Sequence, residues 1–189
     1  MDKILFESKG GFMKVKSPER PYFYAERKGV DSVAFILIDS NRGGDDYGVT
    51  HERKPPMDDR YNTKFFLETA FGGSNDMVAD EHYFNMSDDE VINHFKELVK
   101  IETKEEAGYT VDIDRIKFVS KEFVSTQMNQ WCFLFAVNVT DIEVGERDPQ
   151  NETEALAEVR WKTLDEVNKL NDWKTKTIVF NMLYHTIAG

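Results

Sequence analysis

The sequence contains one cysteine, Cys132, so it cannot form a disulfide within the chain. Chains without disulfides are typical of reducing compartments, and we therefore predict a cytoplasmic protein. Long apolar runs are also absent, since none approaches the roughly 20 residues of a membrane-spanning helix. The N-terminus, Met1-Asp2-Lys3-Ile4, lacks the architecture of a signal peptide. We expect no membrane association.

Positive charge is scarce as well. The chain has 24 lysines and arginines against 35 aspartates and glutamates, which gives a net charge of −11. Because nucleic acid duplexes are recognised by basic surfaces, we expect no such partner. A nucleotide-sized substrate remains compatible, since a bound metal and a few arginines can reverse the sign locally. The four histidines show no ligand spacing, which argues against zinc.

Length and periodicity predict a single α+β domain over residues 1–189. The hydrophobic fraction of 40% and the aromatic fraction of 13% are those of a globular chain with a proper core. Short apolar runs in residues 1–29 predict strands of a small N-terminal sheet. Ser87 and Glu90 form a capping box for a helix that Gly108 would stop. Later strands are expected at 30–38, 47–53, 64–68, 116–119, 131–139 and 159–161, with helices opening at Leu164 and covering 173–187.

The end of the helix between Ser87 and Gly108 is a cluster of anions. Glu102, Glu105 and Glu106 lie on one face, where like charges at i and i+4 and the helix dipole each cost a few tenths to about 1 kcal/mol. A divalent cation would remove both costs, and carboxylates without His or Cys suit Mg²⁺ or Mn²⁺. The alternative is a solvated acidic face. Against that alternative, the lysines of the helix line up on a different face, at Lys96, Lys100 and Lys104.

These residues resemble the Nudix box, which reads Gly, five residues, Glu, seven residues, then Arg-Glu-aliphatic-x-Glu-Glu-x-Gly-aliphatic. The four matching positions are Glu102, Glu105, Glu106 and Gly108. Tyr109 follows, as in many members that act on ADP-ribose.

The match also has departures. Ile101 stands where the family has Arg, Thr103 replaces an aliphatic residue, and Asn93 replaces the upstream Glu. The Gly72-Gly73 pair, which we predict to form a loop after the strand at 64–68, lies further upstream than the family spacing. Residues from about 75 to 85 therefore look like an insertion. Farther upstream, the segment 68–72, Glu-Thr-Ala-Phe-Gly, resembles the family's Glu-x-Pro-Ala-Gly.

The resemblance implies a Nudix-type α/β/α sandwich with a mixed sheet and a small N-terminal antiparallel sheet. It also implies metal-dependent hydrolysis of a nucleoside diphosphate derivative, with an ADP-ribose-like substrate favoured. Dimers that pair through the N-terminal sheet are common among such members, so residues 1–29 are a candidate element for a homodimer. No proline follows the box in the loop at 124–130, where ADP-ribose-specific members often carry one.

The resemblance further suggests roles for individual residues. Glu102 and Glu106 would bind Mg²⁺ or Mn²⁺ directly, with Glu105 as a ligand or an orienting group. The backbone carbonyl of Phe71 or Gly72 could complete the metal shell. Candidates for the general base and for substrate binding complete the set: Glu152 and Glu154 from the loop before the last strand, Arg27 and Arg53 for the pyrophosphate, and Glu68 for the metal shell or a ribose hydroxyl.

Two other interpretations stay open. The loss of the box arginine at Ile101 fits a catalytically silent Nudix-fold module that binds a nucleotide or a protein. An unrelated acidic interaction domain would have neither a specific metal site nor a pocket beside Glu102. Metal-dependent turnover of a nucleotide separates these readings from the enzyme.

Overall fold

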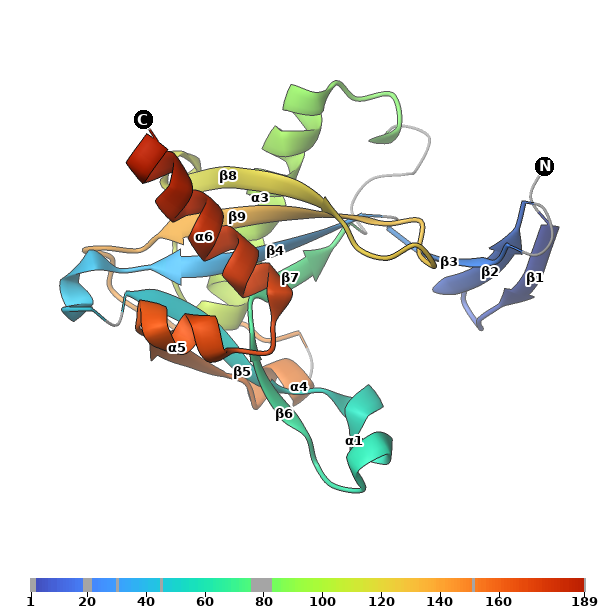
Figure 1. Cartoon of the computed structure of the whole chain (residues 1–189), viewed down its shortest axis with the longest axis horizontal. Coiled ribbons are helices and arrows are strands. Elements are labelled where there is room, and N and C mark those ends of the chain that lie inside the picture. Colours follow the sequence, from blue (N-terminus) through green and yellow to red (C-terminus); the bar gives the residue numbers. More distant parts are fainter. Residues whose placement is uncertain are drawn as a thin grey trace.

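Two β-sheets organise the chain (Figure 1). The computed structural model describes residues 3–18, 22–29, 31–44, 46–75, 83–150 and 152–188. Within these ranges the strands are β1 (Lys3–Glu7), β2 (Met13–Ser17), β3 (Tyr24–Arg27), β4 (Ser32–Ile38), β5 (Tyr47–Arg53), β6 (Phe66–Thr69), β7 (Phe71–Ser74), β8 (Ile116–Phe123), β9 (Trp131–Asn138) and β10 (Glu158–Lys162). The helices are α1 (Pro55–Tyr61), α3 (Asp88–Ala107), α4 (Glu152–Ala155), α5 (Leu164–Lys169) and α6 (Trp173–Ala188), with 3-10 turns η1 (Ser40–Arg42) and η2 (Ile113–Arg115).

The first sheet is small and antiparallel, in the order β1-β2-β3, and it stands apart from the body of the molecule in Figure 1. Its outer strand exposes apolar side chains, among them Ile4 and Phe6 at 49% and 56% exposure. The predicted N-terminal antiparallel sheet is confirmed.

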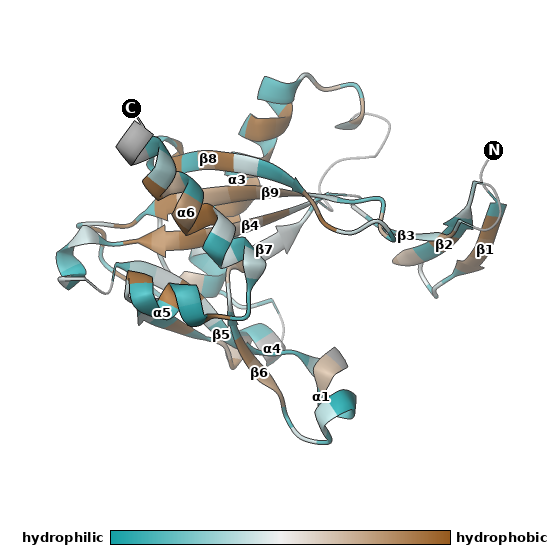
Figure 2. Cartoon of the chain, viewed as in Figure 1, coloured by the Kyte–Doolittle hydropathy of each residue, from teal (hydrophilic) through white to brown (hydrophobic). Residues whose placement is uncertain are grey.

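The second sheet is mixed and has the order β10-β5-β4-β9-β8, with β6 added to β5 and β7 to β4. The β4–β9 pair is parallel, and the other pairs are antiparallel. A strand at the centre of a covered sheet must be apolar on both faces, and β4 (SVAFILI) and β9 (WCFLFAVN) meet that condition. Figure 2 shows the hydrophobic colour concentrated on β9 and along β4.

Alternation along β4 divides the core between two faces of this sheet. Val33, Phe35 and Leu37 pack in a cluster with side chains of α3, whereas Ala34 and Ile36 pack with side chains of α5 and α6. The result is a sheet with helices on both faces. The predicted α/β/α sandwich is confirmed. No helix within the described ranges is long and apolar enough to cross a membrane.

The helix that carries the acidic cluster has the predicted ends. The Ser87 hydroxyl accepts the Glu90 N–H, and the Glu90 carboxylate accepts the Ser87 N–H at 2.8 Å, which completes the capping box. At the other end Gly108 has φ +79°, a left-handed conformation that favours glycine. Val91, Phe95 and Leu98 are buried against the sheet, so the helix cannot rotate about its axis.

One local prediction was wrong, and one helix was not predicted. The sequence places Gly72 and Gly73 in a loop, yet they lie in β7, which pairs with β4. A Cβ on Gly72 would lie 3.0 Å from the Val33 carbonyl oxygen, so glycine at this position permits a close approach of the two backbones. From composition alone, a pair of glycines instead suggests a turn. The unpredicted helix is α1, which begins at Pro55 directly after β5, because proline is well suited to the first turn of a helix. Part of the predicted insertion, residues 76–82, lies outside the described residues.

Candidate active site

The last two turns of α3 bring carboxylates against strand β7. Glu102 lies so close to Gly73 that a Cβ on that glycine would collide with the Glu102 carboxylate. The Gly72 N–H donates a hydrogen bond to Glu106, one turn further along the helix. The glycine pair therefore lets the β7 backbone approach both predicted metal ligands.

Glu106 has an unusual electrostatic environment. Its Oε2 is buried and has no hydrogen-bond partner within the described part of the chain. Burial raises the pKa of this carboxyl to about 8, and the negative charges of Glu102, Glu52 and Glu154 act in the same direction, against the Gly72 hydrogen bond. An unpaired carboxylate oxygen among other carboxylates is the donor set that a hard divalent cation prefers, so these residues fit Mg²⁺ or Mn²⁺.

A cavity of about 470 Å³ opens in front of Glu106. Its lining combines anions and cations from five elements and the segments beside them: Glu52, Lys54, Ala70, Gly72, Glu106, Glu154 and Lys174. Lys54 forms an ion pair with Glu52. The cavity therefore holds the two kinds of group that a metal-bound phosphate needs, carboxylates for the cation and ammonium groups for the anion.

Three of these lining residues were missed by sequence reasoning. Glu52, Lys54 and Lys174 carry no motif, and the sequence drew attention to Arg53 instead. Side chains alternate along a strand, so Glu52 and Arg53 must point to opposite faces of the sheet. That alternation could have identified Glu52. Glu52 is four residues after Gly48 and so lies on the same face of β5, and Gly48 faces Leu37 and Trp161 on the α3 side.

Glu105 is separated from this cavity. Its Oε1 accepts a hydrogen bond from Gln150 Nε2 at 3.1 Å, and it lines a second cavity of about 500 Å³ with Ile101 and Lys104. Burial raises the pKa of Glu105, helped by the charges of Asp148 and Glu154 and opposed by the Gln150 hydrogen bond. Within the described ranges, no three His, Cys, Asp or Glu side chains stand ready as a complete metal site.

The two base candidates differ in position. Glu152 is exposed at the start of α4, whereas Glu154 lies in the wall of the Glu106 cavity. The Glu154 carboxylate accepts the Gln150 N–H at 2.7 Å. Of the pair, Glu154 is the one that the fold brings to the acidic cluster.

Arg27 lines a neighbouring cavity of about 410 Å³ that shares Gly72 and Lys174 with the acidic one. Its Nη2 donates to Ser74 Oγ at 2.9 Å. Phe71 belongs to the core, because its ring is buried and stacks on Phe35 with centroids 5.2 Å apart. The structure thus places Arg27 and the β7 backbone next to the acidic cavity, although neither Arg27 nor Phe71 lines it.

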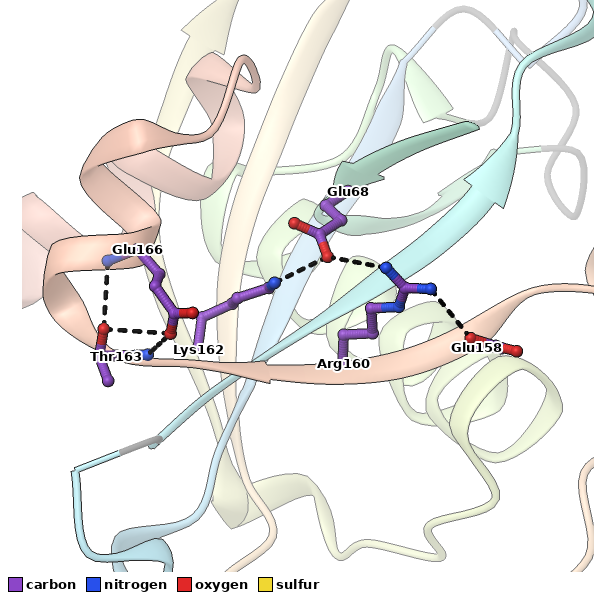
Figure 3. Close-up of polar contacts among 6 residues, drawn as sticks. All are labelled: Glu68, Glu158, Arg160, Lys162, Thr163 and Glu166. Atoms are coloured by element: carbon purple, nitrogen blue, oxygen red, sulfur yellow. Dashed lines mark hydrogen bonds and ion pairs between the residues drawn. The ribbon is translucent and has the colours of Figure 1, made fainter. Parts of the chain in front are cut away.

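Arg53 and Glu68 lie on the opposite face of the sheet. Arg53 donates to Asp58, with Nε 2.7 Å from Oδ2. Glu68 pairs with Arg160 at 3.3 Å and Lys162 at 2.7 Å on β10 (Figure 3). Burial alone would raise the pKa of Glu68, but the hydrogen bonds and charges of these two cations lower it. Neither Arg53 nor Glu68 is among the residues that line the Glu106 cavity.

Comparison with known proteins supports the fold. No protein-family profile and no curated protein matches the sequence. Among solved structures, an ADP compounds hydrolase superposes with a TM-score of 0.64 at 13% identity, over 99% of this chain and 95% of that one. Two further matches have TM-scores of 0.42. They are a MutT protein studied in Aliivibrio salmonicida and Vibrio cholerae (15% identity, 75% of this chain and 85% of the other) and a candidate Nudix hydrolase from Listeria monocytogenes (16%, 80% and 90%).

The chain shares the fold of the ADP compounds hydrolase, an α/β/α sandwich with a mixed sheet, in agreement with the fold that the sequence resemblance implied. At 13% identity the likeness to the ADP compounds hydrolase concerns the fold alone.

Proposed function

We propose that the protein is a metal-dependent Nudix pyrophosphohydrolase that cleaves the pyrophosphate bond of a nucleoside diphosphate derivative. The observation that carries this proposal is Glu106, whose buried Oε2 has no hydrogen-bond partner among the described residues and faces a cavity with other carboxylates. Stable proteins rarely leave such an oxygen unsatisfied, and clusters of strongly perturbed acids in a cleft mark functional sites.

Glu102 and Glu106 would hold Mg²⁺ or Mn²⁺, with the backbone carbonyl of Phe71 or Gly72 as a further ligand. When bound, the cation would offset charge on the pyrophosphate oxygens and lower the pKa of the attacking water. Glu105, which accepts from Gln150, would orient this end of the helix. Lys54 and Lys174 line the cavity and would attract the phosphate oxygens.

Glu154 would act as the general base. It would take the proton of a water whose oxygen forms a bond to one phosphorus, while the bond from that phosphorus to the bridging oxygen breaks. The bridging oxygen then leaves on the second phosphate, so the products are two phosphate monoesters. A base of this kind typically contributes about 10²- to 10⁴-fold to the rate.

An ADP-ribose-like compound is the first substrate to test, because the best-superposing neighbour described above is called an ADP compounds hydrolase. The decisive experiment is a panel of ADP-ribose, dinucleotide cofactors, dinucleoside polyphosphates, nucleotide sugars and nucleoside triphosphates, incubated with Mg²⁺, with Mn²⁺ or with chelator. We expect metal-dependent cleavage of one class. If a folded sample cleaves no member of the panel, the proposal is contradicted.

A second function, a catalytically silent nucleotide-binding or regulatory module, is favoured by one observation. Ile101 is 39% exposed where the family has an arginine, so no cation at this position aligns the glutamates. This module would bind a panel member with a measurable Kd and release no product. Equilibrium binding measured beside product release separates it from the enzyme.

We further propose a homodimer formed through the N-terminal sheet of a cytoplasmic protein. The outer strand β1 exposes Ile4, Leu5 and Phe6 at 49%, 44% and 56%. Exposed apolar edge strands commonly pair with another chain. Light scattering should give twice the chain mass, and Phe6→Glu should shift the protein toward the monomer. A wild-type protein that is monomeric at all concentrations would contradict this.

A further inference from the structure

We propose that Arg147 is a positioning residue that fixes Glu154 beside Glu106 and so supplies part of the alignment that Ile101 cannot provide. This inference rests on the proposed hydrolase and adds to it a residue that no motif marks. It concerns the segment made of residues 145–150 and 152–157, which carries Glu154 across the end of α3.

The beginning of this segment is pinned to the end of α3. The Gly145 N–H donates to the Gly108 carbonyl at 2.9 Å, and the Asp148 N–H donates to the Glu105 carbonyl at 3.3 Å. The last carbonyls of a helix have no partner within the helix, so the segment satisfies two groups that would otherwise need water. A Cβ on Gly108 would lie 2.6 Å from the Gly145 oxygen, which shows how closely the two backbones approach.

Arg147 holds the other end of the segment. Its Nη1 donates to the Ala157 carbonyl at 2.7 Å, and its Nη2 donates to the Glu154 carbonyl at 2.6 Å. A planar guanidinium can bridge two acceptors in fixed geometry, which an ammonium group cannot do. Its Nε is buried without a hydrogen-bond partner among the described residues.

The consequence is a defined place for the Glu154 carboxylate. Its backbone is held by Arg147, and its side chain accepts the Gln150 N–H while Gln150 Nε2 donates to Glu105. Glu154 then lies in the wall of the cavity that contains Glu106. In the resemblance stated above, an arginine inside the box pairs with a box glutamate. In this chain, Gln150 and Arg147 approach the C-terminal end of α3 from the segment that carries Glu154.

The test compares Arg147→Met and Arg147→Lys with a matched control, Arg115→Met. Arg115 also bridges two backbone carbonyls, those of Asn138 and Thr140, at 3.4 Å and 2.9 Å, outside the acidic cavity. With ADP-ribose and Mg²⁺, or whichever panel member is cleaved, we expect Arg147→Met to lower kcat about 100-fold, with KM little changed, because small displacements of catalytic groups have effects of this size. Arg147→Lys should recover little, and Arg115→Met should keep the wild-type kcat.

A double-mutant cycle asks whether Arg147 acts through Glu154. If it does, Arg147→Met combined with Glu154→Gln is no slower than Glu154→Gln alone. Additive losses, or a wild-type kcat in Arg147→Met, would overturn the inference.

Amide hydrogen exchange provides a readout that does not need turnover. Arg147→Met should speed exchange of residues 152–157 at least about tenfold, whereas Arg115→Met should leave them unchanged. Unchanged exchange in Arg147→Met would overturn the positioning role even in an active enzyme. If the wild type cleaves nothing, the proposed function fails, and this exchange measurement still decides whether Arg147 holds Glu154.

Discussion

The two faces of the central sheet differ in whether their carboxylates have cationic partners. On the α5 and α6 face, Glu68 lies between Arg160 and Lys162, and these partners lower its pKa (Figure 3). On the α3 face, Glu106 is surrounded by other carboxylates, and its pKa rises to about 8. The charge of Glu68 is compensated within the chain, whereas a cation could compensate the charge of Glu106 and its neighbours. This difference is the reason for proposing the cation site on the α3 face.

The largest effect on activity should come from removing the carboxylate of Glu106, which lies among Glu102, Glu52 and Glu154. Glu106→Gln keeps the shape of the side chain and removes its negative charge. We expect metal-dependent cleavage to fall by more than about 100-fold, since even groups that only support a metal ligand cost 10- to 100-fold. Initial rates with ADP-ribose and Mg²⁺ measure this.

The matched control for that variant is Glu97→Gln, on the same helix but exposed and outside the acidic cavity. It loses the same charge and should retain the wild-type rate. Equal losses in both variants would indicate a general effect of net charge and contradict the special role of Glu106.

The stability of the metal-free protein should depend on pH in the direction set by Glu106. The pKa of this group rises from 4.5 in its ordinary state to about 8 in the fold, so the folded protein binds more protons than the unfolded one between these values. Its contribution is therefore complete below about pH 4.5 and is lost as the pH rises toward 8, with a slope of at most about 1.4 kcal/mol per pH unit.

Urea unfolding in chelator, at several pH values, measures this slope. Glu106→Gln should flatten the dependence and should be more stable than the wild type at pH 8. A wild type that gains stability from pH 5 to 8 while Glu106→Gln does not would show that the group is already ionised and paired.

The stability contributed by Glu68 and its partners Arg160 and Lys162 should depend on pH in the opposite direction and by a smaller amount. Glu68→Gln removes an ion pair that is partly open to solvent, so we expect a loss of about 1 kcal/mol or less at neutral pH. Because the pKa of Glu68 is lowered in the fold, its contribution is present above its ordinary value and is lost as the pH falls through the lower, folded value. A cycle with Lys162→Met isolates the pair. Stabilisation by Glu68→Gln at neutral pH would remove the contrast between the two faces.

The fold was largely predictable because its main elements carry strong local signals. The apolar runs of β4 and β9 and the caps at Ser87 and Gly108 predict the sheet centre and the ends of α3. The strand β7 escaped because its two glycines resemble a turn, and only the tertiary contact with Val33 explains them. Helix α1 escaped because its two prolines end one element and begin the next.

The site was predictable only where residues share an element. Helical spacing relates Glu102 to Glu106, and the structure puts both against β7. Glu52 and Lys174 come from other parts of the chain, and nothing local relates them to the helix. Glu68 matches a family position in the sequence, yet the strand register places its side chain on the α5 and α6 face, in register with His51. Its predicted role in substrate or metal binding stays a prediction.

The most direct test of the account is calorimetric titration of Mn²⁺ into the metal-free wild type, Glu106→Gln and Glu97→Gln. We predict saturable binding to the wild type and to Glu97→Gln, with protons released at pH 7 as Glu106 ionises, and loss of that binding in Glu106→Gln. Equal Mn²⁺ binding by all three proteins, or binding by none, would contradict the claim that the unbalanced carboxylates on the α3 face form a metal site.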